Sequence, residues 1–420
     1  MNMNDLQRIS FENVSPWKML AWLFIAQVCV AFIGRSLAPL GVLIGADLSL
    51  SMAQIGMLPA ALFLGQSFAS IPVGYFTDLI GSRRVLLMLS ICLGLSFLLM
   101  TFTSAFLVLL FLITLGGVGY GSMHPASNRG IIYWFTSKKR GTAMGIKQMG
   151  VTFGSALSAL MLLPLANEWG WRPVLLSACL LLIVVGFIAF LFYKDPPSVK
   201  NTKSLKSNKP THLLPSISAM FKNKALILVS ICAMGLNGGQ MALNTYLVLY
   251  AYERLGISLV LSGVLLVISE VSGSLGRIIW GIISDHLFDG KRIIVLIIIS
   301  FISFLLSLIV AFLPPGTSFW TMSIVTVFLG YCMSGFNGIW MNTATELVPR
   351  EQSGIASGIS ITLGSLGVIV APPLFGSIVD KTGTFVFGWL FLAIVMVLVI
   401  ALLLYTLKVV HTTERRYAKQ

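Results

Sequence analysis

The sequence predicts an all-α membrane protein with twelve transmembrane helices in two halves of six. Of its 420 residues, 57% are apolar and only 10% are charged, and the mean hydropathy is +0.93. A soluble domain carries charge on roughly a quarter of its residues. A span and its loop take about 35 residues, so the length allows about twelve spans and leaves no room for a soluble catalytic domain.

Continuous apolar runs, bounded by polar residues or by glycine and proline, give the helices in chain order. The first six runs cover residues 17–45, 52–77, 84–104, 106–133, 141–167 and 172–193. The last six cover residues 225–251, 258–284, 292–313, 318–345, 353–379 and 385–409. No small-residue cleavage site follows the first run, so we interpret it as a span and not as a signal peptide.

The distribution of basic residues predicts that both termini are cytoplasmic. With the N-terminus inside, 21 of the 28 Lys and Arg residues fall in inside loops and tails, whereas only Arg172, Arg254 and Lys381 fall outside. Cytoplasmic loops of membrane proteins carry such an excess. The net charge of +14 therefore reflects topology, and no nucleic-acid partner is expected.

The longest polar segment divides the chain into two bundles. Residues 194–224 contain Pro196, Pro197 and seven lysines, a composition typical of a solvated linker. The predicted domains are an N-terminal six-helix bundle at 1–193, a cytoplasmic basic linker at 194–224, and a C-terminal bundle with a short cytoplasmic tail at 225–420.

The two halves repeat each other. Gly74 and Asp78, followed by Arg83 and Arg84, recur 207 residues later as Gly281 and Asp285, followed by Lys291 and Arg292. A second echo pairs the glycines and alanine of residues 141–145 with those of residues 354–358. Two parallel six-span repeats are the plan of a rocker-type secondary transporter.

At these residues the sequence resembles the major facilitator superfamily, over essentially the whole chain. Gly74, Asp78, Gly81, Arg83 and Arg84 match its motif between spans two and three, although Leu79 stands where a basic residue is usual. The resemblance implies a cytoplasmic gate in which Asp78, and Asp285 in the second half, meet positive groups while Gly74 and Gly281 allow close helix approach. The alternative is that the charges only set the topology.

A further block resembles the bacterial organic-anion carriers: the anion:cation symporters, the cyanate and nitrate-type permeases, and the oxalate and monocarboxylate carriers. The block comprises Gly117, Gly119, Pro125, Trp134, Phe135, Arg140, Gly141, Ala143, Gly145, Gly150, Gly154, Gly170, Trp171 and Arg172, together with Phe32, Arg35, Gly276, Arg277, Trp280 and Gly281. Two features depart from related patterns. An arginine early in span four is absent, and span five lacks the Gly-Pro signature of drug/proton antiporters.

Four basic residues remain at membrane depth against one clear acid, Glu270. They are Arg35, Arg129, Lys147 and Arg277. A charge at the bilayer centre costs about 3 kcal/mol or more, so such residues face a cavity or pair with each other. This excess predicts a cavity for an anion.

Three of these cations are candidate substrate ligands. Arg35 lies between Gly34 and Ser36, whose small side chains leave room for a substrate. The planar guanidinium of Arg35 can donate two parallel hydrogen bonds to a carboxylate. Arg277 lies about 12 Å deeper than Asp285 at 1.5 Å per residue, and Lys147 is the third. The alternatives are a structural pair for Arg35, a second-half gate for Arg277 and snorkelling for Lys147. Arg129 and Arg140 are assigned to the cytoplasmic gate.

Amide side chains offer further hydrogen bonds to a substrate. Asn237, Gln240 and Asn244 recur at helical spacing in span seven, and Asn337 and Asn342 lie in span ten. They either contact hydroxyl and carbonyl groups of the substrate or join helices to each other.

Glu270 and His124 are the candidates for proton coupling. A buried carboxylate is pushed toward neutrality by desolvation and toward ionisation by a nearby cation such as Arg277. A histidine titrates in the physiological range. The alternatives are a permanent ion pair for Glu270 and a packing role for His124.

Together these observations predict a secondary active transporter that imports a small organic anion, a carboxylate or sugar acid, by proton symport with alternating access. An anion exchanger, an efflux carrier, and a membrane receptor or channel are the alternatives. We expect a monomer in the lipid bilayer of a bacterial inner membrane, with protons as the coupling ion. No catalytic residue, metal or cofactor is expected. The five cysteines show no CxxC spacing.

Overall fold

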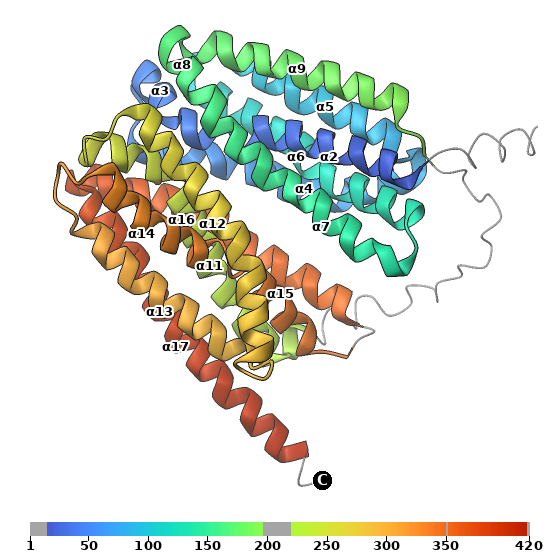
Figure 1. Cartoon of the computed structure of the whole chain (residues 1–420), viewed down its shortest axis with the longest axis vertical. Coiled ribbons are helices and arrows are strands. Elements are labelled where there is room, and N and C mark those ends of the chain that lie inside the picture. Colours follow the sequence, from blue (N-terminus) through green and yellow to red (C-terminus); the bar gives the residue numbers. More distant parts are fainter. Residues whose placement is uncertain (1–14, 196–219, 350–351, 418–420) are drawn as a thin grey trace, which may run out of the picture. The chain divides into compact units, whose positions relative to one another are not determined.

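The computed structural model describes residues 15–195, 220–349 and 352–417, and this part of the chain is helical without strands (Figure 1). Twelve helical segments in it are long and apolar enough to cross a membrane, from Pro16–Leu48 to Phe385–Val410. The predicted all-α class and the twelve spans are confirmed. In lipid a helix satisfies its own backbone polar groups, which is why long apolar runs fold in this way.

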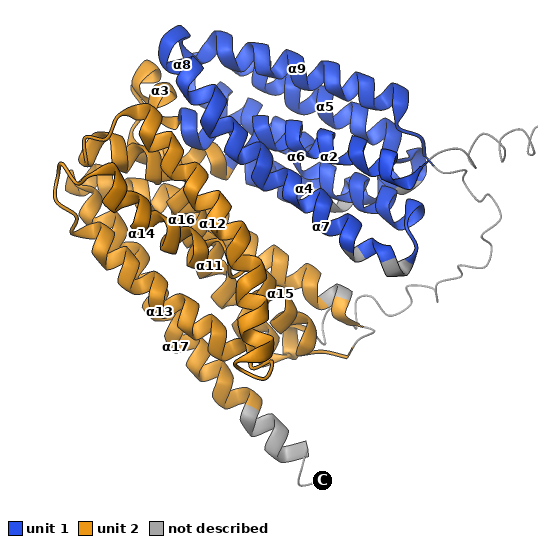
Figure 2. Cartoon of the chain, viewed as in Figure 1, with its two compact units in different colours: residues 1–40, 61–208 blue, residues 41–60, 209–420 orange. Residues whose placement is uncertain are grey.

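Contacts between Cα atoms divide the chain into two compact units (Figure 2). Unit 1 comprises residues 1–40 and 61–208, and unit 2 comprises residues 41–60 and 209–420. The division therefore passes through the first two spans as well as through the segment between the halves. Most of the expected linker, residues 196–219, lies outside the described residues.

Unit 1 holds the helices of the first half. They are α2 (Pro16–Gly34), the part of α4 (Met52–Ile80) that follows Ala60, α5 (Ser82–Met100), α6 (Phe106–Trp134), α7 (Ser137–Leu157), α8 (Leu163–Trp169) and α9 (Trp171–Phe192). A π-helical turn, η1 (Ser158–Leu162), joins α7 to α8 within span five. Helix α2 packs along α7, and α5 packs between α6 and α9.

Unit 2 holds the helices of the second half and most of α3 (Leu37–Leu48). They are α11 (Lys224–Leu249), the π-helical turn η2 (Tyr250–Arg254), α12 (Leu259–His286), α13 (Arg292–Ala311), α14 (Phe319–Met333), α15 (Asn337–Glu346), α16 (Ser353–Thr382) and α17 (Phe385–Tyr417). Helix α11 packs along α16, α12 along α14, and α13 along α17.

The first nine residues of α4, Met52–Ala60, belong to unit 2, and α16 and α11 hold the start of this segment. The Asp380 carboxylate accepts hydrogen bonds from the backbone N–H groups of Met52 and Ala53, both at 2.8 Å. The Tyr246 hydroxyl lies 2.8 Å from the carbonyl oxygens of Met52 and Pro372. A carboxylate at a helix N-terminus satisfies N–H groups that the helix itself cannot.

Two spans that the hydropathy pattern predicts as continuous are broken. Span one breaks at Arg35 and Ser36 between α2 and α3, and span ten breaks at residues 334–336 between α14 and α15. The Ser36 hydroxyl donates to the Ile33 carbonyl at 2.7 Å, so it satisfies a group near the end of α2. Broken spans expose helix ends, which line the binding sites of many carriers.

Candidate functional site

Arg35 lies at the break in span one. Its Nε donates to the Tyr120 hydroxyl at 3.2 Å, and its guanidinium lies 5.3 Å from the centre of the Phe63 ring. A Cβ atom on Gly34 would collide with the Tyr120 ring, so glycine allows this tyrosine to approach the backbone. Helices α4 and α6 thus fix the orientation of the guanidinium through an aromatic face and a hydroxyl.

Lys147 is a buried cation whose described hydrogen-bond partners are neutral. The residue is 2% exposed, and its Nζ lies 3.1 Å from His124 Nδ1 and 3.4 Å from the Asn128 Oδ1 that accepts from it. Both partners come from α6, while Lys147 comes from α7. Within the described residues no acidic side chain pairs with this ammonium group.

In unit 2, Arg277 and Asn337 hold the break in span ten. Arg277 Nε donates to the Ser334 carbonyl at 3.1 Å, and Asn337 Nδ2 donates to the same carbonyl at 3.2 Å. Asn337 Nδ2 also lies 3.2 Å from Gln240 Oε1. The structure therefore brings together Arg277, Asn337 and Gln240 around the buried C-terminal end of α14.

Glu270 and Asn244 form a second polar contact in unit 2. Asn244 Nδ2 donates to Glu270 Oε1 at 3.1 Å, and the two residues are 3% and 6% exposed. The other two amides of the predicted set do not join them. Asn237 donates to the Ala233 carbonyl of its own helix at 2.9 Å, and Asn342 is exposed.

At the end of α4 in unit 1, Asp195 holds the turn into α5, which sequence reasoning missed. Its carboxylate accepts from the backbone N–H groups of Ser82 at 3.0 Å and Arg83 at 3.1 Å. Burial raises the pKa of Asp195, and the opposing influences include the Arg83 N–H bond and the Arg129 charge. Gly81 has a φ of +92°, and a Cβ there would collide with this carboxylate. Nothing in the spacing of a loop aspartate indicates such a contact.

Of the other predicted gate arginines of unit 1, two donate to backbone carbonyl groups near helix ends, one lies over an aromatic ring and one is exposed. Arg83 Nε donates to the Phe190 carbonyl at 2.5 Å. Arg140 donates to the carbonyls of Phe135 at 3.0 Å and Ile132 at 2.9 Å. The Arg129 guanidinium lies 5.2 Å from the centre of the Tyr133 ring, and Arg84 is exposed.

In unit 2 the repeated gate motif forms an ion-pair cluster. Arg292 pairs with Asp285 at 3.2 Å and with Glu346 at 2.7 Å. Exposed pairs of this kind contribute roughly 0–1 kcal/mol to stability. The side chain of Asp78, the counterpart of Asp285, lies outside the described residues. A Cβ atom on Gly74 or Gly281 would meet no described atom within 4 Å, which differs from the close helix approach that the motif predicts.

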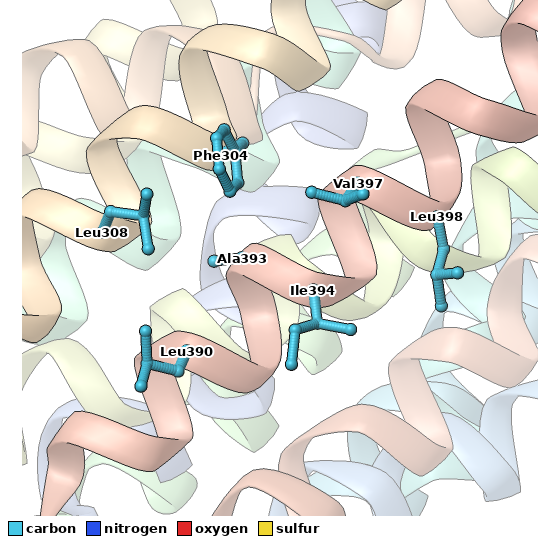
Figure 3. A pocket seen from close by; sticks show the side chains of 7 residues that line it. All are labelled: Phe304, Leu308, Leu390, Ala393, Ile394, Val397 and Leu398. Carbon is cyan, nitrogen blue, oxygen red and sulfur yellow. The ribbon is translucent and has the colours of Figure 1, made fainter.

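A groove between α13 and α17 differs in chemistry from these polar clusters. It has a volume of about 260 Å³ and is lined by seven apolar side chains (Figure 3). They are Phe304, Leu308, Leu390, Ala393, Ile394, Val397 and Leu398. With no polar lining atom, this groove suits acyl chains and not a charged solute.

Solved structures show the same fold. The chain is similar to a bacterial homologue of the human lysosomal transporter Spinster, with 18% identity, a TM-score of 0.74, and coverage of 93% of this chain and 95% of that one. It is also similar to the nucleoside transporter NupG, with 17% identity, a TM-score of 0.77, and coverage of 92% and 99%.

Three curated relatives are named as transporters or probable transporters of acidic solutes. A hexuronate transporter of Bacillus subtilis is 23% identical, with coverage of 87% of this chain and 89% of that protein. A probable galactarate/D-glucarate transporter, GudP of Escherichia coli, is 26% identical, with 81% of each covered. A probable sulfoacetate transporter, SauU of Cupriavidus necator, is 22% identical, with coverage of 89% and 90%.

The family model described as Major Facilitator Superfamily matches residues 23–314 and 290–419, which together span nearly the whole described chain. This match agrees with the twelve apolar helices and with the fold of the solved transporters. The chain is therefore a multi-pass integral membrane protein and a transporter, not an enzyme, and it belongs to the major facilitator superfamily.

Proposed function

We propose that the protein imports a small organic anion, a carboxylate of the sugar-acid class, by proton symport. The observation that carries this proposal is Lys147, a 2% exposed ammonium group that bonds only to neutral side chains among the described residues. An uncompensated buried charge is costly. A bound anion would compensate it.

Arg35 supports the same assignment in unit 1. Its guanidinium is oriented by Tyr120 and Phe63 at the break in span one, and a planar fork suits a carboxylate. Arg277, Gln240 and Asn337 at the break in span ten are the candidate ligands that unit 2 offers. We assign the amides to hydroxyl and carbonyl groups of the solute, which a sugar acid carries in addition to its carboxylate.

The names of the relatives favour this substrate class. A hexuronate, a galactarate or D-glucarate, and a sulfoacetate transporter share organic acids as their named solutes. The solutes differ in length and in the number of acidic groups, but each carries at least one anionic group. A cationic site is the feature that all of them require.

Alternating access of two repeated halves and a cytoplasmic location of both termini complete the proposal. The 207-residue repeat and the inside excess of basic residues support these two points. We place the protein as a monomer in the bacterial inner membrane. The buried Glu270 of unit 2 and the partly buried His124 of unit 1 are our candidates for coupling transport to protons.

Uptake by proteoliposomes tests this function. With an inward proton gradient, we expect D-glucuronate, D-glucarate or sulfoacetate to accumulate inside above its outside concentration. Dissipating the gradient with a protonophore should abolish the accumulation. Rapid exchange without accumulation would indicate an anion exchanger, and failure of all three anions to enter would contradict the proposed substrate class.

A further inference from the structure

Only one proton can lie between the two nitrogens of the contact between Lys147 and His124. The two nitrogens, Lys147 Nζ and His124 Nδ1, lie 3.1 Å apart. An ammonium group has no acceptor, so Nδ1 must be the acceptor if Lys147 is charged, and the imidazole is then neutral with its proton on Nε2. A charged imidazole with a charged lysine would place two donors against each other. With Lys147 charged, the pair therefore carries a single positive charge.

The surroundings of the pair keep it at one charge. Helices α6 and α7 supply Asn128 as the second acceptor for Lys147, and the charged groups that act on His124 are Lys147 and Arg35. Both are cations. Within the described residues no acid bonds to His124 or to Lys147, so nothing in the resting site compensates a second positive charge.

We propose that this Lys147–His124 pair is the proton-coupling site of the carrier, an inference that rests on the proposed anion transport. An arriving carboxylate accepts a hydrogen bond from the Lys147 ammonium, which leaves His124 Nδ1. The lone pair of Nδ1 is then free and takes up one proton from the bulk solution, so the imidazole becomes cationic. One negative charge and one proton enter together, so the net charge of the site is unchanged.

This arrangement makes anion and proton binding mutually favourable. The anion removes the bond that occupied Nδ1 and offsets the added charge, so it raises the proton affinity of His124. By linkage, a proton on His124 raises the affinity for the anion by the same factor. Symport requires this coupling, because neither partner should cross alone.

Proton uptake on binding tests the assignment. Isothermal titration of the purified full-length protein with D-glucuronate, in two buffers of different ionisation enthalpy, gives the number of protons taken up per anion. D-glucuronate is already ionised at neutral pH, so those protons bind to the protein. We expect about one for the wild-type protein when His124 is neutral before binding and charged after it.

His124→Asn keeps an acceptor near the position of Nδ1 but cannot be protonated, so binding should remain and proton uptake should fall close to zero. His286→Asn is the matched control, because His286 is an exposed histidine in the last turn of α12. It should keep the wild-type value. Wild-type proton uptake by His124→Asn would overturn the proposal. So would a loss of proton uptake in Glu270→Gln that His124→Asn does not show.

A measurement on the wild-type protein gives an answer even if His124→Asn does not fold. The affinity for D-glucuronate should rise about tenfold for each pH unit of acidification, over the range in which the imidazole is neutral without the anion and charged with it. An affinity that does not change with pH would overturn the coupling site. Absence of binding by D-glucuronate, D-glucarate and sulfoacetate alike would instead contradict the proposed function on which it rests.

Discussion

Lys147→Met should abolish anion uptake without destabilising the protein. Removing one partner of a buried charge pair costs about 2–5 kcal/mol, and 2.8 kcal/mol corresponds to a hundredfold loss of affinity at 1.4 kcal/mol per factor of ten. We expect at least this loss for D-glucuronate in a binding or uptake assay.

The stability of the same variant separates a functional cation from a structural one. In the unliganded protein, Lys147 is a buried charge without an acidic partner among the described residues. Methionine of similar length removes that cost, although it leaves His124 Nδ1 and Asn128 Oδ1 without their donor. The midpoint of thermal unfolding in detergent should therefore stay equal or rise.

Lys139→Met is the matched control, because Lys139 lies on the same helix α7 and is exposed. It should leave uptake unchanged. A Lys147→Met variant that unfolds well below the wild-type temperature would show that the ammonium group is structural. Wild-type uptake by a well-folded Lys147→Met would remove this residue from the site.

Arg35→Lys should reduce uptake at least tenfold while the protein still folds and inserts. The substitution keeps the positive charge but loses the planar guanidinium, its Nε bond to Tyr120 and its contact with the Phe63 ring. A flexible ammonium group at this break cannot offer two parallel hydrogen bonds to a carboxylate. Initial rates of D-glucuronate uptake, normalised to the amount of inserted protein, measure the effect.

Two further variants serve as comparisons for Arg35→Lys. Tyr120→Phe removes only the hydroxyl that accepts from Arg35 Nε, so its effect should be smaller than that of Arg35→Lys. Arg254→Lys, at an exposed arginine of η2, should leave the rate unchanged. Full activity of Arg35→Lys would show that charge alone suffices and that the fork has no role.

The sequence was sufficient to predict the fold because a bilayer leaves few solutions for long apolar runs. Its hydrophobic core excludes irregular lipid-exposed backbone, so each run of about 20 apolar residues must become a spanning helix. The repeat of Gly74 and Asp78 at Gly281 and Asp285 predicts two halves of six spans, whereas the contacts place residues 41–60 of the first half in unit 2. The breaks at Arg35 and at residues 334–336 were not predictable in this way, because hydropathy averages over a span and does not record local backbone geometry.

The candidate site was predictable as a set of residues but not as a set of contacts. A charge inside the bilayer has a high free-energy cost, so a basic residue in an apolar run is a candidate for function. This argument selected Arg35, Lys147 and Arg277. His124 and Lys147 lie on different helices, and only helix packing decides that their nitrogens meet. The contacts of Tyr120 with Arg35 and of Asn128 with Lys147 also depend on helix packing. Tyrosine and asparagine are common in helices, so neither residue type indicates such a contact. Asp195 and Asp380 were missed because a loop or helix-end acid has no spacing that indicates which N-terminus it caps.

Comparison of D-glucuronate with D-glucose in one binding assay tests the central claim most directly, because the two differ by a carboxylate in place of a hydroxymethyl group. Titration of the purified wild-type protein should give saturable binding of D-glucuronate and at least a hundredfold weaker binding of D-glucose, since only the acid compensates the buried Lys147. Equal affinity for the two sugars, or a preference for D-glucose, would contradict an anion site in this protein.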